Sequence, residues 1–186
     1  VPTLMDLEAR FRVMDGFDAY IQVISVASPP IHSIAPPKVA SELCRLANDE
    51  LAELVLKHPH RFAAGIATLP MNDMDAALKE AQRAIKDLRL RAVELYTDIN
   101  GQPLDAPQFM PLYEMLADLD RPIFIHPLRE MTTPDYAGEK ISRYRVWTKL
   151  GWPYATALAM TRLVYGGVLE KWPGLQIVAH HCGGLI

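Results

Sequence analysis

The sequence predicts an α/β fold of the (β/α)8 TIM-barrel type, incomplete at both ends, with about strands 2 to 6 of the barrel present. Five short apolar segments alternate with four amphipathic segments along the chain. No glycine-rich phosphate-binding turn follows any of the apolar segments, which disfavours an open nucleotide-binding sheet. Polar residues instead collect where several of these segments end, as is typical of a barrel.

The first predicted strand covers residues 20–27, where YIQVISVA is almost wholly apolar. Such a run is expected of a strand buried on both faces of a parallel sheet. A proline-rich loop follows, and an amphipathic helix is then expected to end at Pro59. Its inward stripe is predicted to comprise Leu43, Leu46, Ala47, Leu51, Leu54 and Val55.

The same alternation continues to the end of the sequence. Residues 63–70 predict a second strand, and Asp73 is the expected N-cap of the next helix. The inward side of that helix is predicted to comprise Met74, Ala77, Leu78, Ala81, Ile85 and Leu88. Further strands are expected over 91–97, 122–127 and 175–181, and further helices over 107–119 and 153–171. Strict alternation of strands and helices indicates a parallel sheet, in which the crossover connections are right-handed.

The number of strands limits how much of a barrel the sequence can form. A closed barrel has eight strands in about 250 residues, whereas these 186 residues provide five strands. We therefore expect residues 1–186 to form a single partial barrel domain that lacks the first strand and the last two. Residues 128–152 are expected to form a long insertion on the active face, because they exceed an ordinary βα turn.

Composition narrows the expected partners and location. The net charge of −3 comes from 19 basic and 22 acidic residues without a long block of one sign, so nucleic acid is not an expected partner. Cys44 and Cys182 form no disulfide framework and suit a reducing compartment, so we expect a cytoplasmic protein. No apolar run reaches the length of a membrane span and no export signal opens the sequence, so no membrane association is expected.

His126 is the candidate metal ligand. It ends the apolar run IFI, and Pro127 then turns the chain away, so the imidazole should project into the mouth of the barrel. The alternative is a histidine that merely caps a strand. His32, in the loop after the first strand, is a weaker candidate on the same face, whereas His58 and His60 should lie at the opposite end.

The segment HHCGG closes the last predicted strand. Strand alternation points His180 and His181 to opposite sides, so we expect one of them at the centre and the other as a structural histidine behind the sheet. The paired glycines permit a tight turn close to the mouth. Cys182 could act as a nucleophile or zinc ligand, but an inert thiol is the favoured interpretation.

Glu94 lies inside an otherwise apolar strand. A buried carboxylate is costly unless it is paired, protonated or bound to a metal. We therefore expect Glu94, together with His180, to support the metal site from behind. A salt bridge to Arg91 or Arg121 is the equally favoured alternative.

The 128–152 segment carries candidate substrate contacts in Arg129, Trp147 and Trp152. Arginines suit a carboxylate, and aromatic side chains suit a flat ring. The same composition also makes contacts between subunits, so a homodimer is a further expectation.

Four segments, in their order, resemble the amidohydrolase-related family (amidohydrolase 2): RFAAGIATLPMNDMDAALKE, NGQPLD, PIFIHP and GGVLEKWPGLQIVAHHCGG. The likeness runs along essentially the whole sequence and is strongest to the branch of aminocarboxymuconate-semialdehyde decarboxylase and the resorcylate decarboxylases. The resemblance implies a divalent metal, usually zinc and in some members manganese. It also implies ligands from an H-x-H pair, a histidine that ends strand five and an aspartate on strand eight.

Of those ligands the resemblance places only His126 in this sequence, and alignment on the paired glycines matches His181 with the histidine that handles protons. Because the H-x-H pair and the aspartate are missing, we expect the 186 residues alone to bind metal poorly and to be inactive. The implied activity is non-oxidative decarboxylation of an aromatic or unsaturated carboxylic acid. The alternatives are metal-dependent hydrolysis of a lactone, ester or amide, and a non-catalytic barrel scaffold.

Overall fold

A computed structural model of the chain describes residues 2–26 and 28–185. Its main element is a five-stranded parallel sheet whose spatial order is the order of the strands along the chain. The strands are β1 (Gln22–Ile24), β2 (Phe62–Ala67), β3 (Ala92–Tyr96), β6 (Ile123–His126) and β7 (Ile177–Ala179). A doubly wound sheet would reverse its strand order at a switch point. The predicted partial barrel is therefore confirmed.

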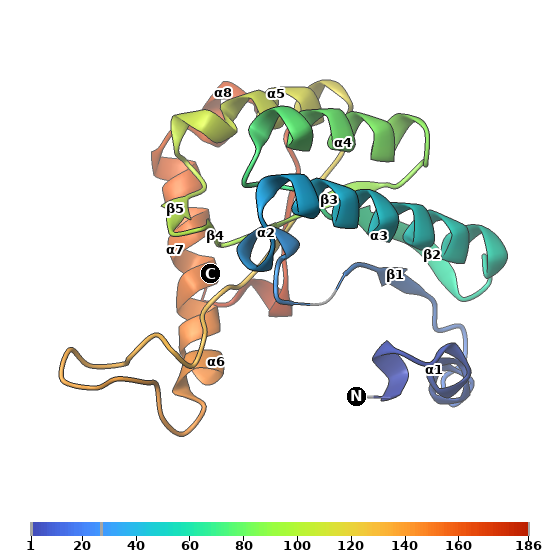
Figure 1. Cartoon of the computed structure of the whole chain (residues 1–186), viewed down its shortest axis with the longest axis horizontal. Helices are drawn as coiled ribbons and strands as arrows, with labels where there is room; N and C mark the ends of the chain where they lie inside the picture. Colours follow the sequence, from blue (N-terminus) through green and yellow to red (C-terminus); the bar gives the residue numbers. More distant parts are fainter. Residues whose placement is uncertain (1, 27, 186) are drawn as a thin grey trace.

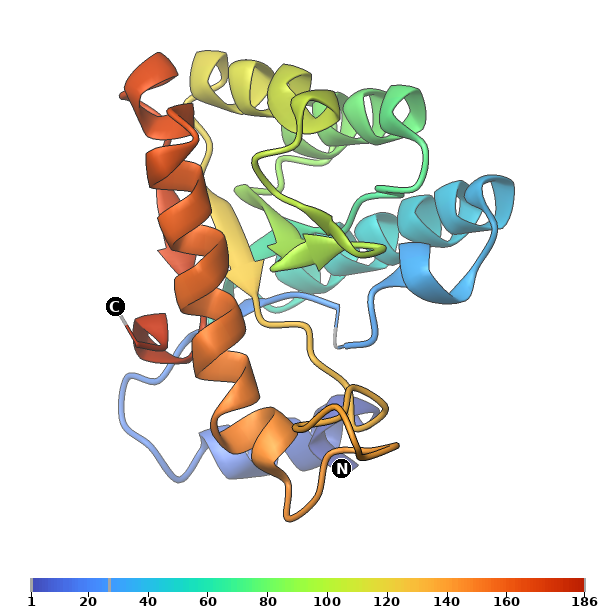
Figure 2. The ribbon, with the colours of Figure 1, turned by 90° about the vertical axis from the view of Figure 1, so that its left-hand side faces the viewer.

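Helices follow the strands and surround the sheet in an arc (Figures 1 and 2). The longer helices are α1 (Leu7–Met14), α3 (Pro37–Lys57), α4 (Met74–Lys86), α5 (Met110–Asp118) and α7 (Gly151–Tyr165). The short helical elements are η1 (Pro2–Leu4), α2 (Ile31–Ile34), η2 (Pro107–Phe109), α6 (Val146–Lys149), α8 (Val168–Lys171) and η3 (His181–Gly183). Among the described helices, none combines the length and the apolar character that crossing a membrane requires.

The two faces of the sheet differ in chemistry. One face carries Val93, Leu95, Ile123 and Ile125, which are buried in the main hydrophobic core beneath the helices; that core also contains Leu112, Leu116 and Ala81. The other face carries two cross-strand pairs, in which Glu94 lies beside Phe124 and Tyr96 lies beside His126. Because side chains alternate along a strand, the polar residues of β3 and β6 share this second face.

The strands at the edges of the sheet differ from prediction. All of β3 is buried, as expected for a strand covered on both faces. In β1 and β7, however, Val23 is 51% and Val178 is 41% exposed, because each edge strand has a neighbour on one side only. Tyr20 and Ile21, predicted as part of the first strand, precede β1 and are exposed; Ala27 lies outside the described residues.

The inward side of α3 is also rotated from the predicted stripe. The helix buries Ala40, Cys44, Asn48, Leu51 and Ala52, whereas Leu43 and Leu46 are 40% and 58% exposed. Residues four apart lie on one face of a helix, and here the small and polar members of that face turn inward. The prediction for Leu43 and Leu46 was wrong because it followed hydrophobicity alone.

Helix α4 agrees with its prediction. Asp73 caps it by accepting a hydrogen bond from the backbone nitrogen of Ala76 at 3.1 Å. Ala77, Ala81 and Ile85 are buried. The other predicted members, Met74, Leu78 and Leu88, pack against the core while partly exposed.

Two local features differ from the predicted element pattern. The helix expected over 153–171 breaks into α7 and α8 at Gly166 and Gly167, where Gly167 has φ +74°. A hairpin of β4 (Asp98–Ile99) and β5 (Gln102–Pro103) follows β3, with Asn100 and Gly101 both at positive φ. An Asn-Gly pair is a strong hairpin signal, so the sequence did contain the information for this turn.

Candidate active site

Three histidines form a cluster at the carboxyl ends of β6 and β7. The ring centre of His126 lies 5.1 Å from that of His180 and 5.0 Å from that of His181. The pairing of Ile125 with Ala179 brings His180 beside His126 on the polar face. Each of the two successive histidines therefore lies close to His126, and the expectation that only one of them would do so was wrong.

The turn after β7 explains this arrangement. The strand ends at Ala179, and His181 has φ +53°, so strand alternation no longer applies to it. Gly183 and Gly184 also have positive φ, and a Cβ atom on Gly184 would lie 2.8 Å from the carbonyl oxygen of Pro153 in α7. The tight glycine turn expected from the sequence is therefore present and packs directly against α7.

The hydrogen-bond partner of His126 determines its tautomer. Its Nδ1 lies 2.8 Å from the carbonyl oxygen of Pro127, which can only accept, so Nδ1 carries the hydrogen and Nε2 has the free lone pair. Burial, aided by His180, lowers the pKa of His126 to about 4, so the ring is neutral near pH 7. A neutral imidazole whose other nitrogen donates to a carbonyl is the usual form of a metal-bound histidine.

His181 lies next to the nitrogen through which His126 could bind a metal. Their Nε2 atoms are 3.2 Å apart. In residues 2–26 and 28–185, no group of three or more His, Cys, Asp or Glu side chains is placed to hold a metal. The free nitrogen of His126 therefore fits one ligand position of a metal site, and Nε2 of His181 lies directly beside that position.

Aromatic rings enclose the histidine pair. The Trp152 ring centre lies 5.4 Å from that of His126 and 5.2 Å from that of His181, and it is tilted by only 31° relative to His181. The indole nitrogen of Trp152 donates to the carbonyl oxygen of Arg129 at 3.1 Å, and Trp147 packs edge-on against Trp152. Tyr96 packs edge-on against His126 with ring centres 5.5 Å apart. One side of the pair is therefore an apolar wall.

Glu94 lies on the same face of the sheet and is only 5% exposed. It accepts a hydrogen bond from the hydroxyl of Ser25 at 3.2 Å and lies 3.6 Å from Nε2 of His180. Burial raises the pKa of Glu94 to about 7, although the hydrogen bond from Ser25 opposes this shift. No arginine among the described residues pairs with it, so the alternative of a salt bridge to Arg91 or Arg121 was wrong.

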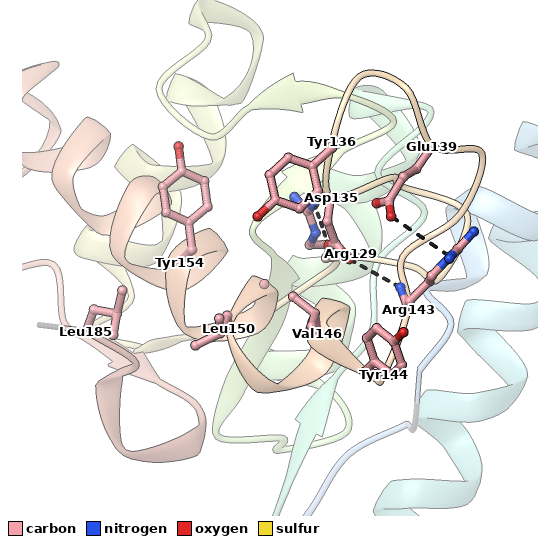
Figure 3. A pocket seen from close by; sticks show the side chains of 11 residues that line it. Arg129, Asp135, Tyr136, Glu139, Arg143, Tyr144, Val146, Leu150, Tyr154 and Leu185 are labelled. Carbon is pink, nitrogen blue, oxygen red and sulfur yellow. Dashed lines mark hydrogen bonds and ion pairs between the residues drawn. The ribbon is translucent and has the colours of Figure 1, made fainter.

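The segment after β6 forms a separate cavity. No helix or strand occurs between His126 and α6 (Figure 2), and the cavity of about 730 Å³ lies between this segment and α7. Arg129 lies 3.7 Å from Asp135, and Arg143 lies 3.9 Å from Glu139. Figure 3 shows both pairs on the wall of the cavity. The charges of both arginines are therefore already balanced within the loop. None of the three clustered histidines lines this cavity.

The remaining histidines lie away from the cluster. His32 is 5% exposed and packs edge-on against Tyr96, which in turn packs edge-on against His126. Burial lowers the pKa of His32 to about 4. His58 packs against Phe62 at the start of β2, the end opposite the cluster, as predicted.

Two contributors to the site were missed from the sequence. Tyr96 lies two residues after Glu94, so strand periodicity could have placed it on the same face. Ser25 lies 69 residues before Glu94, and no local pattern indicates that contact.

Comparison with known proteins gives consistent matches. A family model described as Amidohydrolase matches residues 3–185. The chain is 31% identical over 179 residues to a 2-amino-3-carboxymuconate-6-semialdehyde decarboxylase from Dictyostelium discoideum, covering 96% of this chain and 48% of that protein. It is 34% identical over 191 residues to a gamma-resorcylate decarboxylase from Polaromonas sp. strain JS666, covering 97% of this chain and 57% of that protein.

A solved structure adds a structural comparison. A dihydroxybenzoic acid decarboxylase from Polaromonas sp. JS666, with bound manganese and the inhibitor 2-nitroresorcinol, has a TM-score of 0.78 and 29% identity. The match covers 92% of this chain and 53% of that one. The chain thus spans about half the length of these relatives.

Proposed function

The chain belongs to the amidohydrolase family, and we propose that it supplies part of the active site of a metal-dependent, non-oxidative decarboxylase. The substrate would be an aromatic or unsaturated carboxylic acid. The observation that carries this proposal is the histidine pair, in which His126 has its Nε2 lone pair 3.2 Å from Nε2 of His181. The decarboxylases among the relatives support the choice of reaction.

His126 would hold the metal through Nε2. A bound divalent ion would supply positive charge that holds the carboxylate and polarises an adjacent oxygen of the substrate. Zinc is the proposed metal because neutral imidazole suits it, and the manganese in the Polaromonas structure makes that ion the alternative. The other ligands would come from elsewhere in the complete protein.

His181 would manage the proton. In decarboxylation the bond between the ring carbon and the carboxylate breaks, CO2 leaves, and the carbon takes a proton in its place. His181 is exposed beside His126, where its Nε2 can carry that proton to the substrate. Glu94 and His180 lie behind the pair and would support it.

The aromatic wall would bind the flat part of the substrate. Trp152 lies against each member of the histidine pair, and Trp147 packs edge-on against Trp152. Arg129 would contact the substrate only if it gave up its contact with Asp135. A homodimer and a cytoplasmic location are also proposed; the exposed Tyr136 and Tyr144 of the loop support the first.

Metal content and CO2 release of the complete protein test this proposal. We expect about one metal ion per chain, lost in His126→Ala and retained in His181→Asn, with CO2 release lost in both variants. His58→Ala is the matched control, because that ring lies at the opposite end of the sheet, and it should retain metal and activity. Normal turnover by His181→Asn would refute its proton role. Hydrolysis of a lactone, ester or amide without CO2 release would favour the alternative.

A further inference from the structure

Three distant parts of the chain meet at Glu94, below the histidine pair. Ser25 follows the edge strand β1, Glu94 lies in the central strand β3, and His180 follows the opposite edge strand β7. The Ser25 hydroxyl donates to Oε1 of Glu94 at 3.2 Å, and Nε2 of His180 lies 3.6 Å from the same oxygen. Curvature of the sheet is what allows both edges to reach one carboxylate. The proposed reaction assigns no step to this carboxylate.

The polar atoms at this meeting point lack ordinary partners. Nε2 of His180 and Oε2 of Glu94 are both buried without a hydrogen bond. Leaving such an atom unsatisfied is costly, so the attraction between the two groups should decide how they are protonated. A carboxylate oxygen can only accept, so an attractive contact requires the hydrogen of His180 to be on Nε2.

We propose that Glu94 is a positioning residue that fixes the tautomer of His180, with hydrogen on Nε2 and a lone pair on Nδ1. The backbone of His180 is already held, because its nitrogen donates to the carbonyl oxygen of Ile125 at 3.0 Å. Phe124 packs edge-on against the imidazole. The Glu94 carboxylate is therefore the group that distinguishes the two ring nitrogens.

This tautomer gives the histidine cluster a defined pattern of acceptors. His126 presents Nε2 as its free nitrogen, and His180, with its ring centre 5.1 Å away, presents Nδ1. The ligand suited to the His180 position is therefore a hydrogen-bond donor, such as a hydroxyl group or water. Burial and the nearby His181 lower the pKa of His180, so Glu94 selects between two neutral forms of the ring.

Long-range ¹H–¹⁵N correlation spectra of the imidazole nitrogens test the tautomer directly. The complete protein would be labelled with ¹⁵N-histidine and measured at about pH 8, above the pKa of about 7 that burial gives Glu94. His180→Gln assigns the signals. The wild type should show a protonated Nε2 and an unprotonated Nδ1, and Glu94→Leu should show a mixture of tautomers. Glu94→Gln should restore the wild-type pattern, because its amide oxygen still accepts.

Two controls separate positioning from general disruption. Ser25→Ala removes the neighbouring hydroxyl but not the carboxylate, so it should keep the wild-type tautomer. Signals of His58 and His60, at the opposite end of the sheet, report whether each variant is folded, and Glu94→Ala replaces Glu94→Leu if the latter unfolds. Hydrogen on Nδ1 of the wild type, or an unchanged tautomer in the folded Leu or Ala variant, would overturn the proposal. The readout needs no turnover, so it is independent of the decarboxylase proposal.

Discussion

Replacing Asn48 with alanine should destabilise the protein more than any surface change on the same helix. Asn48 is fully buried in α3 and makes three hydrogen bonds. Its amide nitrogen donates to the carbonyl oxygen of Thr68 at 3.0 Å and to Glu80 at 2.7 Å, and its oxygen accepts from the Thr68 nitrogen at 2.9 Å. Glu80 keeps its contacts with Arg83, but both backbone groups of Thr68 lose their partner.

At about 1 kcal/mol for each bond, and somewhat more for buried groups left unsatisfied, Asn48→Ala should cost about 3–4 kcal/mol of unfolding free energy. Urea unfolding followed by circular dichroism measures this loss of unfolding free energy. Asn48→Asp should be at least as damaging at neutral pH, because it places a second carboxylate against Glu80. Ser41→Ala, which removes only a hydroxyl bonded to Pro37 at the surface, should change stability by less than about 0.5 kcal/mol. A loss below about 1 kcal/mol in Asn48→Ala would refute the reasoning.

Three further changes test other parts of the fold. Tyr113→Phe removes a buried hydroxyl that donates to the carbonyl oxygen of Leu104 at 2.7 Å, and should cost about 1–2 kcal/mol in urea unfolding. Gly184→Ala should lower the midpoint of thermal unfolding, because the new Cβ would lie 2.8 Å from the Pro153 carbonyl oxygen and the residue has φ +71°. An unchanged midpoint would show that this close contact does not destabilise the fold. Burial lowers the pKa of His32 from 6.5 to about 4, so the unfolded chain takes up that proton first and stability falls as pH drops from 6.5 towards 4. In His32→Leu, the unfolding free energy should decrease less between pH 6.5 and 4 than in the wild type. An equal decrease in both proteins would refute the role of His32 in this pH dependence.

The sequence predicted those parts of the fold that depend on local pattern. The run around β3 and the capped helix α4 have the periodicities that strands and helices require, and both lie where expected. The exposure of β1 depends on which strand has no second neighbour, and this is a property of the whole sheet. The rotation of α3 depends on Asn48, whose partner Glu80 lies 32 residues away.

The residues of the candidate site likewise differ in whether a local sequence pattern indicates their position. His126 could be predicted, because a histidine at the end of an apolar strand points to the mouth of a barrel. The joint position of His180 and His181 could not, because it requires a non-glycine residue, His181, with φ +53° two residues after the end of β7. Such left-handed residues cost energy and are concentrated at functional sites, and no residue pattern announces them.

The tautomers of His126 and His180 also differ in whether a neighbouring or a distant residue determines them. The tautomer of His126 is set by the carbonyl of Pro127, its neighbour in the chain, so it should survive any change that leaves β6 intact. The tautomer of His180 is proposed to depend on Glu94, which lies on a strand that is not adjacent to β7. A change in sheet curvature would therefore alter His180 while leaving His126 as it is. Of the two acceptors, His180 is the one that substitutions elsewhere in the barrel can adjust.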